Sequence, residues 1–297
     1  MIKILMSTYN GEKYVAEQIK SILNQSIGDI QIFVRDDGSS DSTVEILREF
    51  VNRGEIILFE GENIGYSKSF FKLMQSCGDS DFFAFCDQDD VWLPDKLKLA
   101  SKKMITSNQD KPTLYYSNYA ICDSNLNKIG NGYSNPRPNF SNILLQCPTN
   151  GFTIVFNNCL RKKYLKSQPE HSLGHDFWLC LLAVTFGEIL FDNEETALWR
   201  RSSSSVTNEN HEFFHRLIYA LSLIKNNNYF NKLTTQLQEF FLIYREEMTE
   251  SQRQRVIPLI KERSFFIQFR KVFFCGRYSW RMQDELFLRF SMLLGML

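Results

Sequence analysis

Several features that would assign the chain to a particular class of protein are missing from its 297 residues. It has no net charge, because 34 Lys and Arg residues balance 34 Asp and Glu residues, so any anion site must be local. No apolar run reaches the roughly 20 residues that span a bilayer. The longest run, residues 177–186, indicates a buried helix. No GxGxxG motif follows the first apolar segment, which argues against a dinucleotide-binding dehydrogenase.

The cysteines show no pairing pattern. None of the seven forms a CxxC motif, and most lie in apolar runs, which indicates buried, reduced thiols. The N-terminus lacks the pattern of a signal peptide, because Met1 leads directly into a segment typical of a strand. These features predict a cytoplasmic protein. Its length allows one substantial domain, or one domain with an appendage.

Short apolar segments alternate with amphipathic segments through the first hundred residues. The apolar segments predict strands at residues 2–6, 30–34, 56–59 and 82–86. Further strands are expected at residues 114–119, 153–156, 189–191 and 196–199, and a helix at 176–186. The alternation predicts an α/β fold of Rossmann-like type, in which a mostly parallel sheet carries helices on both faces.

The polar loops after three of these strands should meet. They begin at Ser7, Asp36 and Asp87, each at the carboxyl end of an expected strand. Ligands of open α/β sheets bind at this edge, so we expect the functional site there.

The pattern becomes purely helical near residue 209. We therefore expect a first domain at residues 1–208 and a C-terminal helical domain at 209–297. Basic and aromatic residues interleave in residues 261–281. Such a segment suits an anionic membrane surface, and it equally suits a helix packed on the first domain with a solvated basic face.

The acidic cluster Asp87-Gln88-Asp89-Asp90 follows a buried strand. Hard divalent cations take oxygen ligands and neutralise a diphosphate leaving group, so this cluster is a candidate metal loop. The alternative is a solvated loop in which Asp90 or Asp95 caps the next helix.

Four segments together resemble a known family. They are Met-Ser-Thr-Tyr-Asn-Gly-Glu-Lys-Tyr at 6–14, Val-Arg-Asp-Asp-Gly-Ser-Ser-Asp-Ser-Thr at 34–43, Asn-Ile-Gly at 63–65 and Phe-Cys-Asp-Gln-Asp-Asp-Val-Trp-Leu-Pro-Asp at 85–95. In order and spacing they resemble the inverting family 2 glycosyltransferases with the GT-A fold. The Asp-Gln-Asp-Asp-Val-Trp form resembles the bacterial rhamnosyltransferase branch. The resemblance is specific over the first hundred residues and weaker to about residue 206.

The resemblance implies a set of donor contacts. The residues implied to bind the nucleotide sugar are Ser7, Thr8, Tyr9, Asp37, Lys68, Asp87 and Arg200. Among them, Asp37 would hydrogen-bond the base, or would otherwise be a turn residue, and Lys68 would approach the diphosphate, or would otherwise be a surface lysine. Asp89 is implied to ligate a divalent metal, Mn²⁺ or Mg²⁺. Ser69 stands where relatives often have Asn.

The resemblance also implies the catalytic base and the acceptor side. An inverting displacement needs one carboxylate to take the acceptor proton, and Asp176 matches the position of that base. Its alternative role is that of a helix N-cap. His175 is expected to orient its neighbours. The implied acceptor contacts are Asn150, Gly151 and Trp178, although Trp178 suits a core position equally well.

One departure concerns the metal. Relatives often carry an Arg-x-His segment after a late strand, and here Arg200 fits while Ser202 replaces the histidine. Weaker metal dependence is therefore expected, with Arg201 supplying positive charge instead.

The implied function is transfer of a sugar, with rhamnose suggested by the branch, from a nucleoside-diphosphate sugar to a saccharide acceptor. The acceptor is expected to be lipid-linked, in bacterial cell-surface polysaccharide synthesis, which suits a peripheral position on the inner face of the cell membrane. A sugar nucleotidyltransferase would need a basic, Gly-rich loop after the first strand, which residues 7–11 lack. A non-catalytic sugar-binding assembly protein stays open, although the joint presence of Asp37, Asp89 and Asp176 argues against it.

Overall fold

The computed structural model describes residues 1–133, 136–201, 228–260, 271–273, 276–279 and 282–293. These form two compact units. The first unit contains residues 1–136, 149–166 and 174–203, and the second contains residues 137–148, 167–173 and 204–297. The predicted boundary at residue 208 lies outside the described residues, and so does most of the basic and aromatic segment 261–281.

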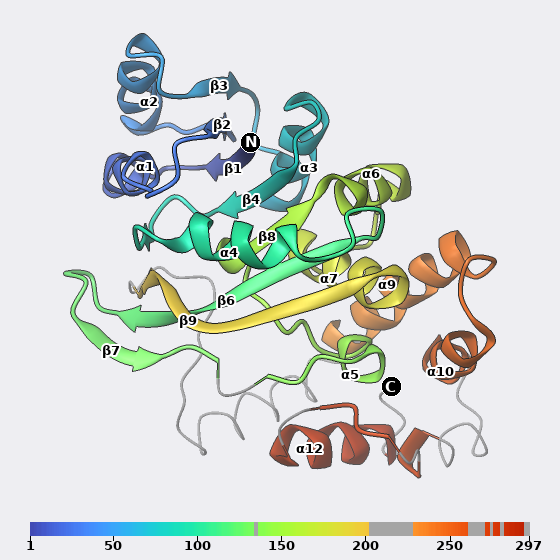
Figure 1. Ribbon diagram of the computed structural model, residues 1–297. Coiled ribbons are helices and arrows are strands. Elements are labelled where there is room, and N and C mark those ends of the chain that lie inside the picture. Colours follow the sequence, from blue (N-terminus) through green and yellow to red (C-terminus); the bar gives the residue numbers. More distant parts are fainter. Residues whose placement is uncertain (134–135, 202–227, 261–270, 274–275, 280–281, 294–297) are drawn as a thin grey trace. The chain divides into compact units, whose positions relative to one another are not determined.

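The first unit is built on one curled sheet, in the order β3-β2-β1-β4-β8-β6-β9-β5, with β7 paired to β6 (Figure 1). Its strands are β1 (Ile2–Thr8), β2 (Ile30–Asp36), β3 (Ile57–Glu60), β4 (Phe82–Cys86), β5 (Val91–Trp92), β6 (Thr113–Cys122), β7 (Lys128–Asn131), β8 (Ile154–Asn157) and β9 (Glu188–Arg200). The alternation of strands and helices thus gives the α/β class predicted from the sequence.

Strand direction places three loops at one edge. Strands β3, β2, β1 and β4 are parallel, and so are β6 and β9, whereas β8, β7 and β5 run antiparallel to their neighbours. Thr8 of β1 pairs with Asp36 of β2, and Met6 of β1 pairs with Cys86 of β4. The loops after these strands therefore begin side by side, as expected.

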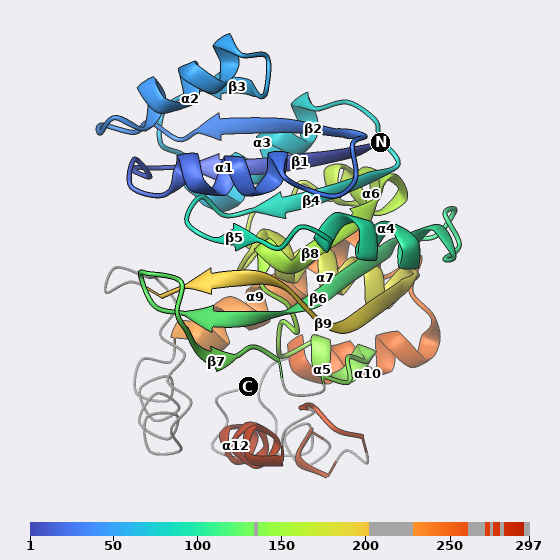
Figure 2. The ribbon, with the colours of Figure 1, turned by 60° about the vertical axis from the view of Figure 1, so that its left-hand side comes forward.

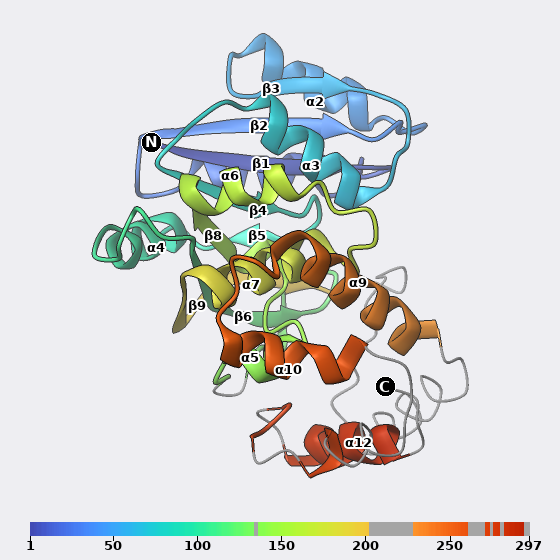
Figure 3. The ribbon, with the colours of Figure 1, turned by 90° about the vertical axis from the view of Figure 1, so that its right-hand side faces the viewer.

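Helices cover both faces of this sheet. The helices and the one 3₁₀ turn of the first unit are α1 (Val15–Leu23), α2 (Thr43–Asn52), α3 (Tyr66–Ser76), α4 (Lys96–Ile105), η1 (Gly151–Thr153), α6 (Asn158–Ser167) and α7 (His175–Phe186). Figure 2 shows α1 and α4 in front of the sheet, and Figure 3 shows α3, α6 and α7 in front from another side. In α1, Val15, Ile19 and Ile22 recur at helical spacing and are buried.

The short strands β5 and β7 were not predicted, and two strands that were predicted separately are one. The strands expected at 189–191 and 196–199 are a single strand, β9, whose register with β6 shifts near Ser117 and Asn118. The polar residues between them suggested a turn. Asp192 and Glu195 remain in the strand because their backbones pair with Ser117 and Asn118 of β6, and Lys103 and Lys128 lie 3.0 and 2.7 Å from their carboxylates.

The second unit is helical in its described part. It contains α5 (Phe140–Ile143), α9 (Asn228–Tyr244), α10 (Glu250–Ile260) and α12 (Met282–Leu293). Leu233, Leu237, Phe240 and Tyr244 of α9 are buried at helical spacing. The six described cysteines are free thiols. Within the described ranges, no helix combines the length and the apolar character required to cross a membrane.

Candidate active site

The loops after β1 and β2 are bound to each other. The Ser40 backbone N–H donates to Asn10 Oδ1 at 2.9 Å, and the Asn10 N–H donates to Ser39 Oγ at 2.9 Å. Asn10 adopts a positive φ of 48°, which asparagine tolerates better than most residues. The Gly11 N–H donates to Thr43 Oγ1 at 2.7 Å. The two loops therefore form one rigid rim at the edge of the sheet.

The two aspartates at the end of β2 have different partners. Asp36 accepts hydrogen bonds from Thr8 Oγ1 at 3.0 Å and from the Ser39 N–H at 2.8 Å, which holds its own loop. Buried Asp37 accepts from the Arg35 guanidinium, and from the N–H groups of Ile64 and Gly65 at 2.9 and 2.8 Å. Asp37 therefore fastens the Asn-Ile-Gly segment to β2.

The predicted donor-binding residues differ in exposure. Tyr9 is 49% exposed and Lys68 is also exposed, so both are open to a ligand. Thr8 is buried and turned toward Asp36. Ser7 Oγ donates to Ser69 Oγ at 2.7 Å, so the serine that replaces the usual asparagine contacts the end of β1.

Gln88 is a site residue that the sequence reasoning missed. Its Oε1 accepts from the Tyr9 N–H at 2.9 Å, and its Nε2 donates to the Tyr9 carbonyl at 3.0 Å. A Cβ at Gly11 would lie 2.3 Å from Gln88 Oε1, so only glycine leaves room for this side chain. Gln88 therefore joins the acidic cluster to the first loop.

The acidic cluster concentrates negative charge after β4. Burial, together with the charges of Asp89 and Asp176, raises the pKa of Asp87 to about 7. Burial also raises the pKa of Asp89, while a backbone hydrogen bond and the nearby Arg200 lower it. Carboxylates held together in this way favour either protonation or a bound cation.

Arg200, at the end of β9, holds the backbone of this cluster. It is 3% exposed. Its Nε donates to the Asp89 carbonyl at 3.0 Å and its Nη1 donates to the Ser124 carbonyl at 2.6 Å. Its Nη2 pairs with Glu17 of α1, and its guanidinium lies 4.2 Å from the Tyr14 ring centroid. Three donors of the guanidinium are thus engaged within the protein. The sequence carries no signal for the role of Glu17.

Asp90 does not cap a helix. Its Oδ1 accepts from the Arg200 N–H at 3.2 Å, and its buried Oδ2 has no partner among the described residues. Burial raises the pKa of Asp90 well above its usual value, and Asp87 and Asp89 raise it further. Buried Lys96 lies nearby, and burial lowers its pKa to about 7. The helix N-cap position belongs to Asp95.

Asp176 lies in the first turn of α7, where Gly174 is the N-cap residue. Its Oδ1 accepts from the Phe177 N–H at 2.8 Å. Burial raises the pKa of Asp176 to about 6, although two backbone hydrogen bonds act in the opposite direction. The ring of its neighbour His175 lies 4.5 Å from that of Phe85, so Asp176 lies near the end of β4, where Asp87 follows, and its charge contributes to the raised pKa of Asp87.

His175 is buried among aromatic rings. Its ring centroid lies 4.2 Å from that of Phe70 and 4.5 Å from that of Phe85. Burial lowers its pKa to about 3, and neither ring nitrogen has a partner among the described residues. A Cβ at Gly151 would lie 3.0 Å from His175 Nε2. His175 is therefore a neutral packing residue behind Asp176.

The expected acceptor residues are only partly accessible. Asn150 and Gly151 are half-buried, and Asn150 Nδ2 donates to Tyr119 Oη at 3.0 Å. Trp178 differs from the expectation that its ring stacks on a sugar. It is fully buried, which is the core position that the sequence left as its alternative.

A divalent cation fits the chemistry of this cluster. Among the described residues, no group of three or more His, Cys, Asp or Glu side chains could hold a metal alone. Mg²⁺ is commonly bound by one or two carboxylates together with substrate phosphates, and Asp87 and Asp89 supply oxygen donors of that kind. Ser202, where a histidine was expected, lies outside the described residues.

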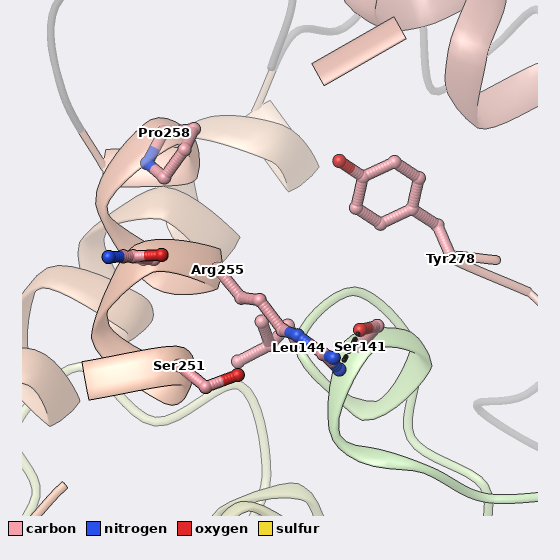
Figure 4. A pocket seen from close by; sticks show the side chains of 7 residues that line it. Ser141, Leu144, Ser251, Arg255, Pro258 and Tyr278 are labelled. Carbon is pink, nitrogen blue, oxygen red and sulfur yellow. Dashed lines mark hydrogen bonds between the residues drawn. The ribbon is translucent and has the colours of Figure 1, made fainter. Parts of the chain in front are cut away.

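Two cavities lie away from these carboxylates. One in the first unit has a volume of about 380 Å³ and is lined by Arg35, Phe59, Glu62, Ile64, Lys72, Leu73 and Ser76. One in the second unit has a volume of about 210 Å³ and is lined by Ser141, Leu144, Ser251, Gln254, Arg255, Pro258 and Tyr278. In the latter, Arg255 Nη1 donates to Ser141 Oγ at 2.9 Å (Figure 4). Neither cavity contains a predicted site residue.

Solved structures with the same fold include TarS of S. aureus. TarS residues 1–349 match with a TM-score of 0.61 and 15% identity, over 99% of this chain and 80% of that one. The mannosyltransferase PcManGT from Pyrobaculum calidifontis, in complex with GDP-Man and Mn²⁺, matches with a TM-score of 0.52 and 14% identity, over 100% of this chain and 80% of that one. At such identities the likeness concerns the fold alone, and the predicted GT-A fold is confirmed.

Curated relatives match parts of the chain. The dTDP-rhamnosyl transferase RfbG of Shigella flexneri is 38% identical over 109 residues, which are 35% of this chain and 38% of RfbG. WfgD of Escherichia coli, a UDP-Glc:α-D-GlcNAc-diphosphoundecaprenol β-1,3-glucosyltransferase, is 27% identical over 61% of this chain and 70% of WfgD. The matched segment thus spans well under half of RfbG.

The Glycosyl transferase family 2 sequence profile matches residues 3–167, which is more than half of the chain. This range contains all the loops that form the rim and the acidic cluster. The chain belongs to glycosyl transferase family 2.

Proposed function

We propose that the protein transfers a sugar from a nucleoside-diphosphate donor to a saccharide acceptor with inversion, and that Asp176 is the base. The observation that carries the proposal is that Asp176 lies in the first turn of α7 close to the end of β4, since the ring of His175 lies 4.5 Å from that of Phe85, two residues before Asp87. A donor-binding cluster and a separate carboxylate on the acceptor side are what a single displacement requires.

The environment of Asp176 supports its role as base. A carboxylate with a pKa of about 6 is ionised at neutral pH and is a stronger base than a solvated aspartate. The hydrogen bond from the Phe177 N–H fixes the direction of one carboxylate oxygen. Asp176 takes the proton of the acceptor hydroxyl while the nucleoside diphosphate leaves.

The rim and the acidic cluster bind the donor in this proposal. Ser7 and Tyr9 line the nucleotide side, the buried side chains of Thr8 and Asp37 hold the loops that form it, and Lys68 is an exposed cation available to the diphosphate. Asp89, with Asp87 beside it, would hold Mn²⁺ or Mg²⁺, which neutralises the charge that develops on the leaving group. Arg200 keeps the Asp89 backbone in place for that purpose.

The donor and the acceptor are proposed from relatives. The resemblance to RfbG favours a dTDP-rhamnose donor, and the resemblance to WfgD favours an acceptor carried on a lipid diphosphate. Such an acceptor resides in a membrane, so we place the protein at the inner face of the cell membrane. Asn150 and Gly151 are the proposed acceptor contacts, as half-buried residues beside His175.

Two measurements test this proposal in turn. Thermal unfolding with a panel of nucleoside diphosphates, with and without Mn²⁺, should reveal one preferred base through stabilisation of the folded protein. Release of nucleoside diphosphate from matching sugar nucleotides should then depend on an added saccharide acceptor. Absence of stabilisation by every nucleotide, together with absence of turnover, would contradict the proposal and favour a non-catalytic role.

A further inference from the structure

Helix α12 of the second unit is apolar on two opposite faces. On one face, Leu288 and Met292 are buried, at 4% and 0% exposure. On the other, Met282, Leu286, Phe290 and Leu293 are 63%, 63%, 53% and 63% exposed. These four residues, which we call the α12 stripe, recur at intervals of four, four and three and therefore share one helix face.

The orientation of α12 is fixed by a buried polar network. The Glu285 carboxylate is buried and accepts from the N–H groups of Tyr278 and Ser279, both at 2.7 Å. It also accepts from Arg289 Nε at 2.7 Å. Arg289 Nη2 donates to the Gly276 carbonyl at 2.8 Å. Turning the helix to bury the stripe would break this network, so the stripe stays on the surface.

The charge of the chain is unevenly distributed along the sequence. Residues 251–297 contain nine Lys and Arg residues and three Asp and Glu residues, a net charge of +6. The first 250 residues contain the other 25 Lys and Arg residues and the other 31 Asp and Glu residues, a net charge of −6. Exposed Arg277 lies beside the stripe, with its Nη2 3.5 Å from Met282 Sδ. The apolar stripe therefore belongs to a strongly basic part of the chain.

We propose that the α12 stripe lies on the surface of an anionic lipid bilayer. A helix that is apolar on both faces needs a second apolar environment in addition to its own core. Exposed apolar side chains in a basic segment, with Arg277 beside them, suit the boundary between anionic headgroups and acyl chains. A second copy of the chain is a poorer occupant, because it would bring the same net charge of +6 against the first.

This inference deepens the proposed function, since a lipid-linked acceptor would be met at such a surface. Its test requires neither donor nor acceptor, so its failure and a failure of the proposed reaction are distinguishable. The full-length protein is floated with vesicles of phosphatidylcholine alone and of phosphatidylcholine mixed with phosphatidylglycerol. We expect flotation only with the mixed vesicles, weakening as salt is added.

Variants locate the contact. Leu286→Ser combined with Phe290→Ser should weaken vesicle binding by about tenfold or more, because two large side chains no longer enter the bilayer. Leu242→Ser removes a side chain that is 69% exposed on α9, outside the stripe, and should bind like the wild type. Circular dichroism should be unchanged, and Leu286→Gln alone provides a milder second variant.

Three results would overturn the proposal. They are equal flotation of the stripe variants and the wild type, failure of the wild type to bind anionic vesicles, or a wild-type dimer in size-exclusion chromatography that the stripe variants convert to a monomer. The last result would identify a second copy as the occupant of the stripe.

Discussion

Arg200 Nε donates to the backbone carbonyl of Asp89 at 3.0 Å, across 111 positions of the sequence. Arg200→Lys should keep the charge and lose the planar fork that contacts Asp89, Ser124 and Glu17 together. We expect the Mn²⁺ concentration that half-saturates donor binding to rise about tenfold, since one charge-assisted hydrogen bond contributes roughly 1.5 kcal/mol. Arg48→Lys, at an exposed pair with Glu60, is the matched control.

Glu17→Gln separates two roles of Arg200. If Arg200 acts by holding the acidic cluster, removing the charge of its partner should weaken metal-dependent donor binding in the same direction as Arg200→Lys. If Arg200 acts only by direct contact with the diphosphate, Glu17→Gln should have no such effect. Titration of Mn²⁺ at a fixed donor concentration distinguishes the two outcomes.

Asp176→Asn should reduce transfer by about 10²- to 10⁴-fold, the usual contribution of a general base. Donor binding in a thermal-shift assay should stay close to that of the wild type. Asp110→Asn, at an exposed loop residue, should change neither transfer nor donor binding. A variant that lost donor binding and transfer together would contradict the role of base.

The rate of transfer should depend on pH through the same residue. Since the pKa of Asp176 is raised to about 6, its carboxylate is ionised above this pH and loses its basicity below it. The rate at saturating substrate should therefore fall as pH is lowered through about 6, and the residual rate of Asp176→Asn should lack this step. A wild-type rate that stayed constant down to pH 4.5 would be incompatible with the assignment.

Gly11→Ala should disturb the contact between the first loop and the acidic cluster. The new Cβ would lie 2.3 Å from Gln88 Oε1, so the glutamine must leave the Tyr9 backbone. Because the end of this half-exposed side chain can move, the cost is the loss of its hydrogen bonds with Tyr9, about 1 kcal/mol of folding free energy. The double variant Gly11→Ala, Gln88→Ser should therefore lose little beyond Gln88→Ser alone in urea unfolding. Gly28→Ala, where the new Cβ meets nothing within 4 Å, is the control.

His175→Phe should make stability less sensitive to acid. The pKa of His175 falls from 6.5 to about 3 on folding. Between these values the imidazole is protonated in the unfolded chain and neutral in the folded chain. Stability is therefore complete above about pH 6.5 and is lost as pH falls toward 3. Between pH 7 and pH 5 this costs the wild type about 2 kcal/mol, which the variant should not lose. Urea unfolding of both proteins at the two pH values measures the difference, and parallel losses would count against the explanation.

The fold followed from local patterns, and part of the site did not. The strands around Met6, Val34 and Phe85 were predictable because each is a continuous apolar run bounded by polar loops. The polar residues within β9 misled the prediction, because their backbones pair with Ser117 and Asn118 of β6, which is distant in the sequence. Periodicity contains no information about such long-range partners.

Individual site residues show the same limit. Asp176 could be placed at a helix start from its neighbours, whereas the burial of Trp178 depends on the packing around all of α7. Gln88 had an indirect signal in Gly11, whose missing side chain makes room for it. The sequence gives no signal for the role of Glu17, because its partner Arg200 lies 183 positions away.

The position of Arg200 also sets the order in which the protein matures. The acidic cluster leaves the ribosome more than a hundred residues before the end of β9, whose pairing with β6 is itself non-local. Non-local pairings of parallel strands form late. A nascent chain therefore carries the acidic cluster without the arginine that fixes its backbone. The cluster gains its final shape only once the last strand has docked, so a chain released early would have the family's motifs without its assembled site.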